Sequence, residues 1–159
     1  MTLIKTLIFT ILAPGTLTIL IPRWLLASSA GRECFSIGVF RYLGLAAIIV
    51  GTSIYLWCAW DFTFAGKGTP APIDPPKELV ARGLYRYVRN PMYVGMTSVL
   101  IGEAFLFQSL TLLAYAGTVL LVFHLFVVLY EEPALTRKFG DSYRRFRETV
   151  PRWIPRLRG

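Results

Sequence analysis

The chain has 159 residues, enough for one domain, and 55% of them are hydrophobic, with a mean hydropathy of +0.55. This is too apolar for an ordinary soluble domain, and apolar runs of about 20 residues indicate helices that span a membrane. The formal net charge of +8 does not indicate nucleic-acid binding, because the charged residues avoid the apolar runs and gather at their ends and in the C-terminal tail.

Four apolar runs predict four transmembrane helices. They cover about residues 3–26, 36–60, 91–107 and 110–130. Pro14-Gly15 and Pro22 interrupt the first run. Only Gln108 and Ser109 separate the last two runs, which predicts a tight antiparallel hairpin. We therefore expect an all-α polytopic membrane protein that forms a single domain over residues 1–159.

Two polar segments connect and follow the predicted spans. Residues 61–90 contain four prolines and predict an extended loop, and residues 131–159 form a basic tail with a short helix around residues 134–148. Pro133 is expected to end the helix before the tail. Of the 17 Lys and Arg residues, fourteen lie on the side of the loop and tail and three on the other (14 + 3 = 17). This asymmetry predicts an integral membrane protein with the loop, the tail and both termini in the cytosol, in the inner membrane if the source is bacterial.

The start of the third span carries more than a helix start needs. Asn90 suits the N-cap and Pro91 the first helical position, but Arg89 and the tyrosines Tyr87 and Tyr93 lie beside them. A helix N-terminus attracts a carboxylate, and the planar guanidinium of an arginine binds one through two parallel hydrogen bonds. The alternative is a capped helix with arginines at the membrane interface.

Glu131 and Glu132 close the fourth span, where they face the negative end of the helix dipole. They are either solvated acids or carboxylates that bind a ligand or pair with an arginine. In the tail, Tyr143, Phe146 and Arg147 share one helix face. That face predicts a lid over a ligand, an amphipathic helix on anionic lipid headgroups, or both.

Polar residues and glycines inside the spans are further candidates. Glu103 and His124 differ in depth, so we do not expect them to pair. His124 is expected to bond to a backbone carbonyl, and the alternative is a part in the reaction centre, for which its depth is suitable. Gly102 predicts close helix packing, whereas Gly95, one turn inside its helix, also leaves room for a ligand. No cluster of Cys and His in the sequence indicates a metal site.

Together these segments resemble the isoprenylcysteine carboxyl methyltransferase family and the related phospholipid methyltransferases. Those families carry Arg-His-Pro-x-Tyr-x-Gly, then Glu-Glu, then Phe-Gly-x-x-Tyr and a Val-Pro-Arg ending. The matching segments here are residues 89–95, 131–132, 139–143 and 150–152. The resemblance covers residues 79–155, about half of the chain, and Asn90 stands where the families usually have His.

The resemblance implies methyl transfer from S-adenosyl-L-methionine to a lipid-like acceptor, most closely the carboxyl of a prenylcysteine. A phospholipid amine as acceptor, and a non-catalytic protein that binds anionic membrane lipids, are the alternatives. The sequence has no G-x-G-x-x-G after a strand, so the cofactor is expected among the last two spans, the loop and the tail. The candidate catalytic residues are Arg89 and Glu132. The candidate cofactor-binding residues are Tyr87, Asn90, Pro91, Tyr93, Gly95, Glu131, Glu132, Tyr143 and Arg147.

The charge asymmetry predicts that the loop and the tail face the same, cytosolic side. Single cysteines at Thr69 and Ser142, in a background without Cys34 and Cys58, should react with an impermeant maleimide only after the cells are opened. Labelling of either position from outside intact cells contradicts this topology.

Overall fold

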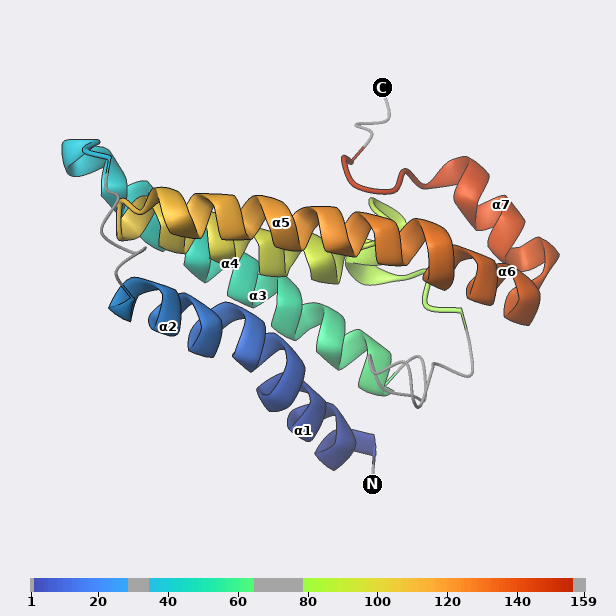
Figure 1. Cartoon of the computed structure of the whole chain (residues 1–159). Helices are drawn as coiled ribbons and strands as arrows, with labels where there is room; N and C mark the ends of the chain where they lie inside the picture. Colours follow the sequence, from blue (N-terminus) through green and yellow to red (C-terminus); the bar gives the residue numbers. More distant parts are fainter. Residues whose placement is uncertain (1, 29–34, 65–78, 156–159) are drawn as a thin grey trace.

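The computed structural model describes residues 2–28, 35–64 and 79–155, and these form helices and turns without any strand (Figure 1). The prediction of an all-α membrane protein is thus confirmed. The middle of the predicted loop, the last four residues of the tail and Cys34 lie outside the described residues. Three apolar helical segments are long enough to cross a membrane, and a fourth is shorter. They are Thr6–Ala27, Gly38–Phe64, Leu110–Phe139 and the shorter Pro91–Leu106.

The first segment is bent and remains continuous. It consists of α1 (Thr2–Gly15), a π-helical turn η1 (Thr16–Leu20) and α2 (Ile21–Ala27). The predicted interruption at Pro14-Gly15 therefore takes the form of one wide turn. Such a turn accommodates a proline, which has no N–H for the regular hydrogen-bond ladder, and Thr18 Oγ1 donates to the Pro14 carbonyl at 2.8 Å.

Glycines hold α3 (Tyr42–Phe64) against α4 (Pro91–Leu106) at close range. A Cβ added to Gly102 would lie 2.5 Å from the carbonyl oxygen of Gly44, which confirms the packing role predicted for Gly102. A Cβ added to Gly95 would lie 2.7 Å from the carbonyl oxygen of Gly51. The space beside Gly95 is therefore filled by α3, and the expectation that it leaves room for a ligand is wrong.

The predicted hairpin between α4 and α5 (Leu110–Phe126) is confirmed. Gln108 adopts a positive φ of 53° in the turn, and the Ser109 hydroxyl caps α5 by accepting from the Leu112 N–H at 3.3 Å. Gln108 also binds the segment that precedes α3. Its backbone oxygen accepts from the Phe35 N–H at 3.0 Å, and its side-chain oxygen accepts from the Ile37 N–H at 2.9 Å. A 3₁₀ turn, η3 (Gly38–Arg41), then leads into α3.

The fourth segment runs beyond its predicted end. A π-helical turn, η5 (Val127–Glu131), joins α5 to α6 (Glu132–Phe139), so Pro133 does not end the helix. Pro133 lies in the first turn of α6, where a missing N–H is tolerated. The chain reverses at Gly140, whose φ of 54° suits glycine, and continues as α7 (Asp141–Thr149). The single tail helix predicted over residues 134–148 is thus two helices.

These reversals bring distant segments together at one end of the molecule. There α6 and α7 lie at the same end of the molecule as the start of α4 and the 3₁₀ turn η4 (Gly83–Arg86) that precedes α4 (Figure 1). The candidate catalytic and cofactor-binding residues come from this end, whereas Glu103 lies near the other end of α4.

Replacing Gly95 with leucine should destabilise the fold by separating α3 from α4. Overpacking of this kind typically costs about 1–3 kcal/mol, and here the obstructing atoms are backbone. The midpoint of thermal unfolding in detergent should fall. Gly117→Ala is the matched control, because a Cβ at Gly117 meets nothing within 4 Å. Equal stability of the two variants contradicts the packing role of Gly95.

Candidate functional site

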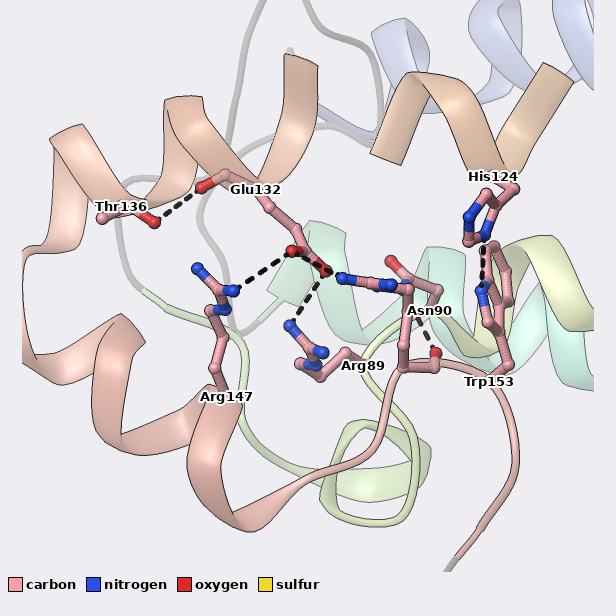
Figure 2. A network of polar contacts seen from close by, with 8 residues as sticks. Arg89, Asn90, His124, Glu132, Thr136, Arg147 and Trp153 are labelled. Carbon is pink, nitrogen blue, oxygen red and sulfur yellow. Dashed lines mark hydrogen bonds and ion pairs between the residues drawn. The ribbon is translucent and has the colours of Figure 1, made fainter. Parts of the chain in front are cut away.

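One buried carboxylate holds three arginines at this end of the molecule (Figure 2). Glu132 Oε1 accepts from Arg89 Nη1 at 2.9 Å and from Arg152 Nε at 2.7 Å. Its Oε2 accepts from Arg152 Nη2 at 3.0 Å and lies 3.6 Å from Arg147 Nη2. The hydrogen bonds to Glu132 raise the pKa of Arg152. Three positive charges surround one negative charge, so the cluster retains positive charge for a further anion.

Residues 150–153, here called the strap, cross the start of α4. The Arg89 N–H donates to the Pro151 carbonyl at 2.9 Å, and the Asn90 side-chain amide donates to the Arg152 carbonyl at 3.2 Å. Asn90 stands at the N-cap position, but its side chain does not cap α4, because the amide is turned to the strap. Pro91 does occupy the first turn of the helix, as predicted.

A cavity of about 200 Å³ lies beside this cluster, bounded by α4, α6 and α7. Its polar lining residues include Arg89, Asn90, Tyr93, Glu131, Lys138 and Tyr143, and aromatic residues such as Phe62 and Phe126 form much of the rest. The Tyr93 hydroxyl donates to Glu131 Oε2 at 2.9 Å. Glu131 and Glu132 therefore divide their roles, because Glu131 faces the cavity whereas Glu132 binds the arginines.

The helix α7 closes one side of the cavity with the face that the sequence predicted. Tyr143 is buried and Phe146 lines the cavity, while Arg147 reaches Glu132. Burial raises the pKa of Tyr143, and the Glu132 charge adds to the effect, so its hydroxyl remains protonated at neutral pH. The basic pair Arg144-Arg145 is exposed on the opposite face. This arrangement fits a lid, and the contact with lipid headgroups stays a prediction.

Five of the candidate residues do not line the cavity, and two of them, Glu132 and Arg147, belong to the adjacent charged cluster. The Tyr87 side chain is 61% exposed, Pro91 is buried at the helix start, and Gly95 faces α3. Tyr87 and Pro91 instead line a separate apolar groove together with the strap residue Trp153. Tyr87 is the C-cap residue of η4. Its place in the motif did not reveal that it lies outside the cavity that Arg89 lines.

Sequence reasoning also missed two partners in the strap. Arg152 makes the shortest bond to Glu132, and its place in the Val-Pro-Arg ending was the available signal. His124 does not bond to a backbone carbonyl as expected, because its Nδ1 accepts from Trp153 Nε1 at 3.2 Å (Figure 2). An indole N–H is a donor without an acceptor function, so it needs such a partner when it is partly buried.

The fold and the charged cavity define a small helical membrane protein whose candidate site is built from the ends of its helices. The family model of phospholipid methyltransferases matches residues 39–142, and the chain belongs to this family. The chain is also 38% identical over 77 residues to the protein-S-isoprenylcysteine O-methyltransferase of Schizosaccharomyces pombe. That match covers 48% of this chain and 33% of the yeast protein, so the chain spans about a third of the relative's length.

Replacing Glu132 with glutamine should loosen the whole cluster. Arg89 is only 10% exposed in its side chain and loses its counterion, and breaking a buried ion pair in this way typically costs about 3–5 kcal/mol. We expect a lower unfolding midpoint and faster proteolysis within residues 141–155. Asp141→Asn is the control, since its ion pair with Arg144 is exposed. Unchanged stability of the Glu132 variant contradicts the role of this carboxylate in holding the tail.

Proposed function

We propose that this protein is an integral membrane methyltransferase that uses S-adenosyl-L-methionine and methylates a lipid-like acceptor, with the carboxyl of a prenylcysteine as the leading candidate. The observation that carries the proposal is the cavity between the Tyr93–Glu131 pair and the arginine cluster. The cavity presents positively charged groups and a carboxylate beside apolar walls, and it lies at the ends of the helices that span the membrane.

The donor set of the cavity fits the cofactor's functional groups. Arg89 lines the cavity, and its Nε is buried without a partner among the described residues. Such a group is unfavourable until an acceptor arrives, and a carboxylate is the acceptor that a guanidinium binds best. The second oxygen of Glu131 suits amino or hydroxyl donors. The cavity is smaller than pockets that usually enclose a whole ligand of this size, so the fit concerns the polar groups.

When bound, S-adenosyl-L-methionine supplies a methyl group on a sulfonium, which is transferred by in-line displacement. This chemistry depends on positioning more than on proton transfer. Tyr93 fixes the direction of the Glu131 carboxylate, and Glu132 fixes the guanidinium of Arg89. The protonated hydroxyl of Tyr143 adds a further donor at the cavity wall. The aromatic residues of the wall keep water away from the charged groups.

Two acceptors fit this site. The excess positive charge of the arginine cluster favours an anionic acceptor, in keeping with the name of the yeast relative, which methylates at oxygen. The match to the phospholipid methyltransferase family model favours a phospholipid amine instead, and the Glu131 carboxylate suits a positively charged headgroup. We rank the carboxyl acceptor first because three arginines surround the single carboxylate of Glu132, which leaves positive charge for an anionic acceptor.

Calorimetry of the detergent-purified protein with S-adenosylhomocysteine tests the proposal, followed by methyl transfer assays with a farnesylated cysteine and with phosphatidylethanolamine. We expect saturable binding and transfer to the farnesylated cysteine. Transfer to phosphatidylethanolamine alone selects the second acceptor. If S-adenosylhomocysteine does not bind, the protein is not a methyltransferase of this type, and binding of anionic lipid becomes the better account.

Replacing Arg89 with lysine should abolish methyl transfer nearly as completely as replacing it with alanine. An ammonium lacks the planar fork, so it cannot bind Glu132 and also present a second aligned N–H to a ligand. Turnover is measured at matched expression and compared with the exposed Arg86→Lys variant, which should retain full activity. Near-normal turnover in Arg89→Lys would make Arg89 a membrane anchor, because lysine and arginine both reach the interface.

A further inference from the structure

A second hollow lies outside the candidate site, along the side of the α4–α5 hairpin. This hairpin groove has a volume of about 620 Å³ and is lined by both helices and by Trp153 of the strap. Among the described residues, none lines both the groove and the cavity of the candidate site. Its walls are largely apolar, and it opens on the flank of two apolar helices, where the surrounding medium is lipid.

Gly117 in the wall of the groove has no structural reason to be glycine. A Cβ at this position meets nothing within 4 Å, and the backbone is helical with no positive φ. Glycine weakens a helix relative to alanine. The helix glycines Gly95 and Gly102, by contrast, both permit contact with α3. What the missing side chain of Gly117 provides is open space in the groove.

Two hydrogen-bond donors line the same groove without partners. Thr97 is 7% exposed, and its Oγ1 has no partner in the described part of the chain. The neighbouring Ser98 and Thr118 instead donate to backbone carbonyls one turn back, each at 2.9 Å. His124 accepts from Trp153 through Nδ1, so its neutral ring carries the proton on Nε2. That N–H is a donor for which the described residues provide no acceptor.

The two donors lie at similar depth on adjacent helices. Thr97 is six residues after Pro91 and His124 seven before Glu131, about 9 and 10 Å along their helices at 1.5 Å per residue. In the hydrocarbon region a polar group without a partner is strongly unfavourable. An oxygen with two lone pairs at the head of an apolar chain satisfies both donors together.

We propose that the hairpin groove binds an acyl chain of a membrane glycerolipid, whose ester carbonyl accepts from the Thr97 hydroxyl and from His124 Nε2. The chain then extends past Gly117 toward the hairpin turn. We treat this lipid as distinct from the methyl acceptor, because none of the described residues lines both the groove and the cavity of the candidate site. The site therefore stands whether or not the proposed function is correct.

Photolabelling of the full-length protein in bicelles tests this site. The probe is a phosphatidylcholine with a diazirine in one acyl chain, and its headgroup nitrogen already carries three methyl groups. We expect labels on α4 and α5 along the groove, mapped by mass spectrometry. Gly117→Leu, which fills the groove, should remove them, whereas Thr118→Leu on the neighbouring face should not. Labelling that Gly117→Leu leaves unchanged overturns the proposal.

Competition by unlabelled lipids tests the two hydrogen bonds. Ester-linked phosphatidylcholine should compete about tenfold better than its ether-linked analogue, which has no carbonyl. In Thr97→Val, which keeps the shape of the side chain, this preference should shrink, and thermal unfolding confirms that the variant is folded. Because its hydroxyl is unpaired in the protein alone, Thr97→Val should not lower the unfolding midpoint. Equal competition by the two lipids in the wild type overturns the proposal.

Discussion

The arrangement of this protein's polar end depends on the requirement that the buried Glu132 carboxylate be neutralised. Arginines from three segments meet it: Arg89 just before the N-cap of α4, Arg147 in α7 and Arg152 in the strap. A buried carboxylate is strongly unfavourable unless it is paired, so each arginine that binds Glu132 fixes the segment that carries it. The positions of α7 and the strap, and with them the walls of the cavity, follow from this one side chain.

Two adjacent glutamates serve different partners at the junction of η5 and α6. Successive residues of an α-helix point about 100° apart, and η5 ends at Glu131 whereas α6 begins at Glu132. Glu131 thus faces Tyr93 and the cavity, while Glu132 faces the arginines. A continuous helix through Pro133 also carries both residues beyond the apolar part of the segment.

Apolar length and turn residues were enough to predict the helices, and the hairpin at Gln108-Ser109 followed from the short gap between two runs. The convergence of Arg89, Tyr93, Glu131 and Tyr143 was also predictable, because each was expected on the same side of the membrane, at the end of a span or in the tail. The partners of individual side chains were not predictable from the sequence. The amide of Asn90 and the ring of His124 bond to strap residues 62 and 29 positions away. Local propensity carries no information about such distant partners. It also failed at Pro133, because the helix continues through this residue despite the helix-breaking tendency of proline.

The order of synthesis gives the strap a particular consequence. Arg89 emerges from the ribosome well before Glu132, and Arg152 and Trp153 emerge after all of the apolar helices. The Arg89 N–H donates to the Pro151 carbonyl in the folded protein. While the hairpin inserts, this N–H must therefore remain solvated at the membrane surface. Because α7 and the strap form part of the site, the cavity is completed only after the apolar helices have been synthesised.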